Sequence, residues 1–138
     1  MSQENVEIVR QLYEAFARRD NESPFAVYHP DIEWDMSRSV APLPGEERIY
    51  HGHDGVRHYW RAWLEAWESI DAPLEPLVDA GEQVVALLGQ STYRGKRSGV
   101  ESTWPPWAQV RTLPDGKVVR MRIYSNHADA LEAAGLSE

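Results

Sequence analysis

The stretch from Glu82 to Asn126, EQVVALLGQSTYRGKRSGVESTWPPWAQVRTLPDGKVVRMRIYSN, decides the fold. It contains runs rich in β-branched and aromatic residues, separated by turn signals at 94–99 and 114–116. This pattern predicts a wall of three consecutive antiparallel strands. Pro105 and Pro106 lie inside the second of these strands. Because each proline removes a hydrogen-bond donor from the ladder, we expect an edge, a bulge or a break there, and a break would help to bend the wall.

The rest of the chain is expected to cover one face of this wall. Periodicity and capping residues predict, in chain order, a helix over 2–19, a short helix from 23, a strand over 31–36, a loop over 37–48, a brief strand over 49–51, a long helix over 54–69, a strand over 74–79, the wall, and a last helix over 127–134. This order predicts an α+β fold with helices on one face of the sheet, in a single domain spanning 1–138. The loop over 37–48 is either a lid or a plain connection.

The composition limits the classes of partner. The formal net charge is −8 and the pI is near 5.1, so repulsion disfavours nucleic acid and anionic membrane surfaces. No apolar run is long enough to span a bilayer, and the N-terminal sequence lacks the form of a signal peptide. There are no cysteines and no nucleotide-binding loop. We therefore expect a cytoplasmic protein without a cofactor, which binds neither nucleic acid nor membranes.

Aromatic residues are the unusual feature of the composition, with six Trp and six Tyr but only two Phe. Alternation over 31–36 places Trp34 and Met36 on one face of a strand and Asp35 on the other. The long helix carries Trp60 and Trp63 on its apolar face. Such residues line ligand cavities and also fill ordinary cores, so both interpretations stay open for these three tryptophans.

His51, His53 and Asp54 form a pattern that could hold a metal ion, because two imidazoles at this spacing share one side of an extended segment. The same segment opens the long helix, where polar residues commonly act as caps. A metal site needs three convergent ligands, which this spacing does not establish. We therefore expect no metal site.

Several motifs, in this order, resemble the NTF2-like superfamily, in particular its SnoaL-like and ketosteroid-isomerase-like branches. They are IVRQLYEAF at 8–16, HPDIEW at 29–34, GHDGV at 52–56, DGKVV at 115–119 and the tail at 124–136. The resemblance covers essentially the whole chain. It implies a cone-shaped, cystatin-like α+β fold, in which a strongly curved mixed or antiparallel sheet wraps around the N-terminal helices and leaves a deep pocket.

The resemblance also assigns the faces of the sheet. It implies a ligand-binding set that combines the wall residues of the inner face with the aromatic residues above: Trp34, Met36, Trp60, Trp63, Leu87, Ser91, Tyr93, Val110, Met121 and Ile123. Arg120, Arg122 and Tyr124 take the outer face. That face is a dimer surface in many family members, so we expect a homodimer formed through it.

The catalytic residues of steroid isomerases are not retained. Those enzymes use a carboxylate base together with a tyrosine and a neutral carboxylic acid. The resemblance places Met36 at the base, Leu12 at the tyrosine and Ala108 at the acid. Because all three are apolar, the remaining catalytic candidates are Tyr93 and Asp35, and Asp35 faces the pocket only if a bulge intervenes.

Two functions remain open from the sequence. The first is binding of a small hydrophobic molecule in the pocket by a cofactor-independent isomerase, cyclase or hydrolase that uses general acid/base chemistry. The alternative is a non-catalytic ligand-binding protein or a dimeric accessory protein. A buried carboxylate or histidine that faces the cavity would distinguish the enzyme from the binding protein.

Overall fold

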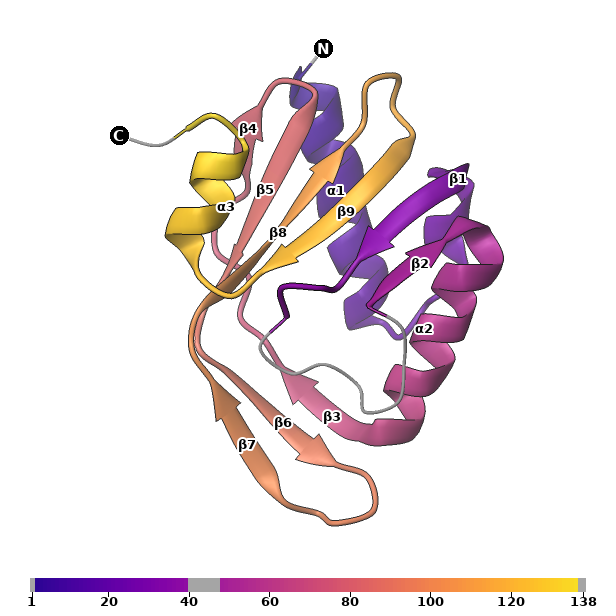
Figure 1. Cartoon of the computed structure of the whole chain (residues 1–138), viewed down its shortest axis with the longest axis vertical. Helices are drawn as coiled ribbons and strands as arrows, with labels where there is room; N and C mark the ends of the chain where they lie inside the picture. Colours follow the sequence, from indigo (N-terminus) through magenta and orange to yellow (C-terminus); the bar gives the residue numbers. More distant parts are fainter. Residues whose placement is uncertain (1, 40–47, 137–138) are drawn as a thin grey trace.

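A curved mixed sheet forms the centre of the fold, and helices lie on both of its faces (Figure 1). The computed structural model describes residues 2–39 and 48–136, so most of the predicted lid or connection at 37–48 lies outside the described residues. The elements are α1 (Ser2–Ala17), η1 (Ser23–Ala26), β1 (Tyr28–Asp35), β2 (Ile49–His51), α2 (Gly52–Ala66), β3 (Trp67–Asp71), β4 (Val78–Ala80), β5 (Gln83–Leu88), β6 (Ser91–Gly95), β7 (Glu101–Trp104), β8 (Trp107–Thr112), β9 (Val118–Tyr124) and α3 (His127–Ala133).

The main sheet has the strand order β2-β1-β9-β8-β5-β4, and β3, β6 and β7 form a second, three-stranded sheet. β1 runs parallel to β9, and every other neighbouring pair is antiparallel. The second sheet continues the first, because β5 leads into β6 and β7 leads into β8 across short breaks (Figure 1). The predicted α+β fold with a curved mixed sheet is confirmed.

The predicted three-strand wall consists of five strands, because both arms of its first hairpin are broken. Pro105 and Pro106 separate β7 from β8, as expected from their missing donors, and a second break falls between Leu88 and Ser91. The residues on either side of each break are three positions apart yet face the same interior: Leu88 pairs with Trp107, and Ser91 pairs with Trp104. Each break therefore shifts the two-residue alternation by one position.

This shift corrects two predictions about the pocket face. Leu87 and Val110 lie on the opposite face, where they pack with Ala130 of α3 and with Ala108 in a separate hydrophobic cluster. The sequence prediction continued a single in-and-out alternation of side chains through Gly89 and Gln90. In the structure, β5 instead presents Val84, Ala86 and Leu88 to the interior. α3 thus covers part of the outer face, and α1 and α2 cover the inner face, where the larger cluster lies.

The end of the second helix is a further correction. The apolar stripe predicted a helix to about Ser69, but α2 ends at Ala66 and Trp67 is extended, with φ −121° and ψ 131°. The chain continues as β3, which pairs with β6 from Trp67 to Asp71. Pairing with a distant strand outweighs local helical periodicity here, which sequence periodicity cannot reveal.

The other predicted elements are present with small changes of boundary. The last helix begins after Asn126, whose side chain accepts a hydrogen bond from the backbone N–H of Asp129 at 2.8 Å. The strand predicted over 74–79 is shorter, since only Val78–Ala80 is paired in β4 and Leu74 forms an isolated bridge to Leu88. None of the helices within the described ranges is long and apolar enough to cross a membrane.

A hydrogen-bonded bridge holds the bend of the hairpin. The indole N–H of Trp107 donates to the Ser91 hydroxyl at 2.8 Å, and that hydroxyl donates to the carbonyl of Gly89 at 2.9 Å. Ser91 is fully buried, so its hydroxyl oxygen takes the place of a water molecule as the acceptor for the Trp107 indole N–H. We expect Ser91→Ala to lower the free energy of unfolding by about 1–3 kcal/mol, because it leaves the buried indole N–H without an acceptor.

Urea denaturation followed by tryptophan fluorescence measures this loss. Thr103→Ala, on the exposed side of β7, is the matched control and should change stability by less than about 0.5 kcal/mol. Equal effects of the two substitutions would show that the bridge does not stabilise the bend.

Candidate functional site

Aromatic rings fill the interior between the sheet and the two covering helices. Trp34 of β1 lies at the centre of one group, with ring centroids 5.7 Å from Tyr28, 5.8 Å from Tyr59 and 6.1 Å from Trp60. Most of these contacts are edge-to-face or tilted, which is the favourable arrangement for aromatic pairs. Trp34 and Tyr59 are buried, whereas Trp60 remains partly exposed between α1 and α2.

A second aromatic group lies under the bend of the hairpin. Tyr93 of β6 stacks on Trp104 of β7 at 3.7 Å, and Trp63 and Trp67 pack edge-on against Tyr93 at 5.7 Å and 5.6 Å. Trp63 also contacts Tyr59, so the two groups are continuous. Trp63, which the sequence analysis put on the apolar face of the long helix, thus lies in this interior.

Arg111 of β8 is the charged residue of this interior. The strand register aligns it with Met121 of β9, Trp34 of β1 and Val84 of β5 in one row across the inner face. Arg111 is 1% exposed, and among the described residues no carboxylate forms an ion pair with it. Burying a cation without a counterion is costly, so this residue calls for a functional explanation.

Neutral partners hold one nitrogen of the guanidinium. Nη1 of Arg111 donates to the Tyr13 hydroxyl of α1 at 2.6 Å and lies 3.4 Å from the Gln109 amide oxygen. The Tyr13 hydroxyl in turn donates to the Gln109 amide oxygen. The guanidinium carbon also lies 4.9 Å from the centre of the Tyr13 ring and 6.0 Å from that of Trp34. Tyr13, Gln109 and Arg111 thus form one polar cluster, which joins α1 to β8.

The unsatisfied polar atoms of the interior are all hydrogen-bond donors. In the part of the chain that the structure describes, they are the Tyr28 hydroxyl, Trp34 Nε1, Trp67 Nε1, the Tyr93 hydroxyl, and Nε and Nη2 of Arg111. Native proteins satisfy most of their buried polar atoms, and each exception needs a reason. The two tyrosine hydroxyls can also accept, but the indole and guanidinium N–H groups can only donate, so the interior is suited to a guest that carries electron-rich oxygen atoms.

Burial keeps the interior hydroxyls protonated. It raises the pKa of Tyr28 above the usual phenol value, and the nearby positive charge of Arg111 offsets only part of this effect. Burial likewise raises the pKa of Tyr13, again with a partial opposing effect of Arg111, and raises the pKa of Tyr59 and Tyr93. At neutral pH these groups are therefore proton donors rather than bases.

The structure places most of the predicted ligand-binding residues in the interior. Trp34, Met36, Trp63, Tyr93, Met121 and Ile123 belong to the main cluster, with Trp60 packed against it. Ser91 also faces inward, but its hydroxyl is engaged by Trp107 and Gly89. Leu87 and Val110 lie outside this set, as described above.

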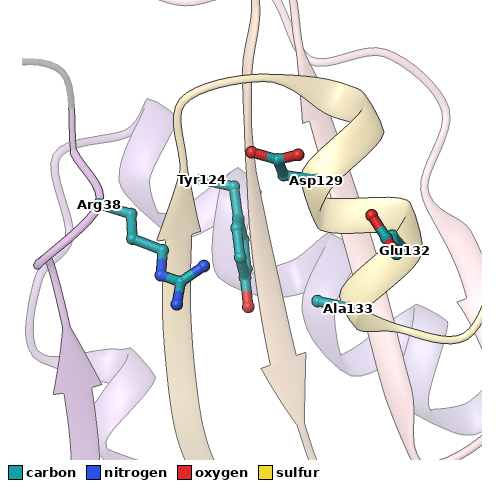
Figure 2. Close-up of a pocket in the computed structure, with 5 residues that line it drawn as sticks. All are labelled: Arg38, Tyr124, Asp129, Glu132 and Ala133. Atoms are coloured by element: carbon teal, nitrogen blue, oxygen red, sulfur yellow. The ribbon is translucent and has the colours of Figure 1, made fainter.

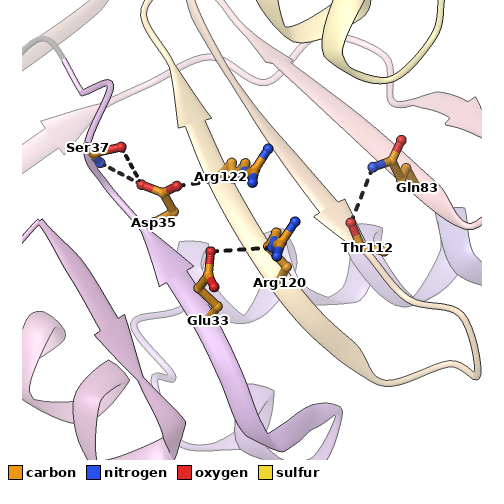
Figure 3. Close-up of polar contacts among 7 residues, drawn as sticks. All are labelled: Glu33, Asp35, Ser37, Gln83, Thr112, Arg120 and Arg122. Carbon is orange, nitrogen blue, oxygen red and sulfur yellow. Dashed lines mark hydrogen bonds and ion pairs between the residues drawn. The ribbon is translucent and has the colours of Figure 1, made fainter.

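Asp35 is placed on the outer face, so it cannot act as a base in the interior. Ser37 donates to its carboxylate through the backbone N–H at 2.9 Å and the hydroxyl at 2.6 Å, and Arg122 Nε lies 3.7 Å away (Figure 3). Glu33 and Arg120 form a second ion pair at 3.4 Å in the next row. No bulge turns Asp35 inward, because Trp34 and Asp35 pair with successive residues Met121 and Arg122.

The outer face also carries a pocket of about 310 Å³ beside α3. It is lined by Arg38, Tyr124, Asp129, Glu132 and Ala133 (Figure 2). Arg38 lies 5.6 Å from the centre of the Tyr124 ring, and the Asp129 carboxylate accepts a bond from the Asn126 side chain at 3.1 Å. These contacts explain the pocket as part of the docking of α3, so we place the candidate site in the interior.

His53 of the His51–Asp54 pattern has structural partners. His53 Nε2 lies 3.0 Å from the carbonyl oxygen of Tyr28, and the His53 ring packs edge-on against Phe25 at 5.1 Å. Within the ranges 2–39 and 48–136, no three histidine or carboxylate side chains are grouped to hold a metal ion.

Sequence reasoning did not identify Tyr13, Gln109 and Arg111 as a site. The signal was the alternation of β8 itself, which places Trp107, Gln109, Arg111 and Leu113 on one face. The inner face was assigned instead to Ala108 and Val110, which concealed the buried arginine.

Comparison with known proteins agrees with this architecture. The SnoaL-like domain family matches residues 9–121. An NTF2-like protein from Burkholderia xenovorans LB400 is 30% identical, with 97% of each chain covered and a TM-score of 0.74. A protein of unknown function with a cystatin-like fold from Xanthomonas campestris is 16% identical, with 97% of this chain and 98% of that chain covered and a TM-score of 0.74.

TerC, crystallised together with polyporic acid, is 21% identical and has a TM-score of 0.74, with 95% of this chain and 97% of that chain covered. No curated protein sequence matches significantly. The α+β cone with helices packed inside a curved, unclosed sheet defines the NTF2-like class. Within this class, the chain belongs to the SnoaL-like domain family.

The buried tyrosines predict a specific response to alkaline pH. Their pKa values are raised in the folded chain, so above the ordinary phenol pKa of about 10 the unfolded chain releases protons that the folded chain retains. The free energy of unfolding should be unaffected by these groups below that pH and should fall as the pH rises above it. Tyr28→Phe should reduce the slope of this decline.

Urea unfolding between pH 8 and about 11 measures the slope, and phenolate absorbance reports which tyrosines ionise in the folded protein. If all six tyrosines of the folded protein ionised together near the ordinary phenol pKa, as exposed tyrosines do, the result would contradict the burial described above.

Proposed function

We propose that this SnoaL-like domain binds a small, largely aromatic or apolar molecule in the interior of the cone. The observation that carries the proposal is the set of buried hydrogen-bond donors without acceptors, which includes Tyr28, Trp34 and Arg111. Ligand sites of this kind combine apolar and aromatic walls with a few convergent polar groups. TerC, a protein of the same fold, was crystallised with polyporic acid, which is consistent with this use of the fold.

The polar groups of the described interior favour electrophilic assistance over base catalysis. Asp35 is the buried carboxylate among the described residues, and it faces outward. The inward groups are protonated tyrosines, an indole N–H and a guanidinium, all of which stabilise negative charge on a bound oxygen. A cofactor-independent reaction at this site would therefore proceed by stabilising an oxyanion or donating a proton, and the non-catalytic alternative needs only binding.

Of the two aromatic groups in the interior, the one around Tyr93 is less favourable for ligand contact. The Tyr93 ring is stacked on Trp104 and enclosed by Trp63 and Trp67, so its hydroxyl lies deep under the bend. Trp34 and Trp60, by contrast, lead from the partly exposed contact between α1 and α2 to the Arg111 cluster. We therefore assign the ligand to the Trp34–Trp60 side of the interior.

A neutral aromatic probe tests this proposal. Isothermal titration calorimetry with 2-naphthamide should show saturable binding, and Trp60→Ala should weaken it by about tenfold or more, since a lost aromatic contact of about 1.4 kcal/mol corresponds to this factor. Leu64→Ala is the matched control on the same helix, because Leu64 is 48% exposed. Absence of binding by both 2-naphthamide and 2-naphthoate would overturn the proposal.

We also propose that two copies of the chain associate through the outer face of β1 and β9. This face carries acidic residues on β1, Glu33 and Asp35, beside basic residues on β9, Arg120 and Arg122 (Figure 3). A two-fold axis between the copies can place the acidic column of one against the basic column of the other, which gives a self-complementary contact.

Sedimentation velocity at micromolar concentration tests the association. The wild-type chain should sediment as a dimer, and Arg120→Glu should shift it towards monomer, because the new carboxylate lies next to Glu33 in both copies. Arg61→Glu makes the same charge change on the exposed side of α2 and should leave the dimer intact. A monomeric wild-type protein would reject the proposal.

A further inference from the structure

The free atoms of Arg111 define one edge of its guanidinium. Nη1 is occupied by the Tyr13 hydroxyl and the Gln109 amide oxygen, whereas Nε and Nη2 have no hydrogen-bond partner. Nε and Nη2 point their N–H groups in the same direction and form a two-pronged fork. The two oxygens of a carboxylate fit such a fork with two parallel hydrogen bonds.

We propose that the Nε–Nη2 edge of Arg111 is a carboxylate-binding site inside the cone and that the natural ligand is an aromatic or apolar carboxylic acid. This inference rests on the proposed function, because it names the chemical class of the molecule that occupies the interior. It assigns a role to a buried cation that packing does not explain.

The charge of the site selects a monoanion. Arg111 and Asp35 are the buried charged residues among those the structure describes, and Asp35 is paired on the other face of the sheet. A single carboxylate would neutralise the interior, whereas a dianionic phosphate would leave an excess negative charge in an apolar environment. A phenolate or an enolate presents one oxygen, which both prongs would have to share, whereas a carboxylate offers each prong its own acceptor.

Tyr13 and Gln109 are positioning residues for this fork. The Tyr13 hydroxyl and the Gln109 amide oxygen both accept from Nη1. Tyr13 belongs to α1 and Gln109 to β8, so contacts from two elements fix the guanidinium before a ligand arrives. A preset donor pair avoids the entropy cost of ordering a flexible arginine upon binding. Neither residue is a carboxylate, so both leave the positive charge available for the ligand.

The neighbouring donors fit the same ligand. The Trp34 ring lies 6.0 Å from the guanidinium carbon and packs against Tyr28 at 5.7 Å, and both residues carry an unsatisfied donor. A carboxylate offers about four lone-pair positions, so it can accept from the Arg111 fork and from a further N–H or O–H. Phe16 and Trp60, which are partly buried, provide apolar surface between the exterior and this cluster.

Two probes with the same aromatic ring, one with a carboxylate and one without, separate the contribution of the ligand's charge to binding from that of its ring. We expect wild-type protein to bind 2-naphthoate about tenfold or more tightly than 2-naphthamide in isothermal titration calorimetry, because the two molecules differ in the group that meets the fork. Arg111→Gln should reduce this ratio to near one while retaining binding of 2-naphthamide. Arg97→Gln removes the same charge from the exposed turn after β6 and should preserve the ratio.

The outcomes distinguish this inference from the proposed function. If both probes bind wild-type protein equally, or if the preference for 2-naphthoate persists in Arg111→Gln, the carboxylate site is overturned while the interior binding site stands. If neither probe binds, the proposed function itself fails. A raised melting temperature of Arg111→Gln together with a lost preference supports the proposal, since removing an unpaired buried charge relieves its desolvation cost.

A direct measurement keeps the test decisive if Arg111→Gln does not fold. The Nε–H resonance of Arg111, assigned by its loss in Arg111→Lys, should move on addition of 2-naphthoate and remain in place with 2-naphthamide. Arg111→Lys retains the charge without the fork and should lose most of the preference. An Nε–H signal that is unaffected by 2-naphthoate overturns the proposal.

Discussion

The bend of the long hairpin is the constraint on which the rest of the structure depends. At both breaks the chain advances three residues while remaining on the same face, so Leu88 and Ser91, and Trp104 and Trp107, all point into the interior. The hydrogen bond from the Trp107 indole to Ser91 fixes this geometry. Without the shift of alternation, Arg111 and Gln109 would face outward, and the interior would lose its polar cluster.

The interior combines the requirements of a core and those of a site. Its aromatic rings supply apolar burial, which stabilises the fold, whereas its buried unpaired donors cost free energy. Such a conflict is typical of functional positions, where selection for binding outweighs selection for stability. The outer face differs in charge, because Asp35 and Glu33 each have an arginine beside them, although Arg122 Nε there is also buried without a hydrogen-bond partner. The contrast supports the interior as the place of function.

Membership of the SnoaL-like family and the fold leave the chemistry open, because one fold supports many functions. The apolar residues at the positions of the steroid-isomerase groups are explained by the structure. Leu12 and Ala108 are buried in separate clusters on opposite sides of the sheet, and Met36 extends the inner row of β1. The polar groups lie one residue away, at Tyr13 and Gln109.

The sequence by itself determined the α+β class, most of the element order apart from β3 and the division of the first hairpin, the capping of α3 by Asn126 and the break at Pro105-Pro106, since each depends on local periodicity or on residues with special backbone chemistry. It also placed Trp34, Trp63 and Tyr93 in the interior. Only the tertiary structure decided the end of α2, the face of Leu87 and Val110, and the burial of Arg111. The physical reason is that these features depend on pairing between distant strands, where a shift by one residue exchanges the two faces of the sheet.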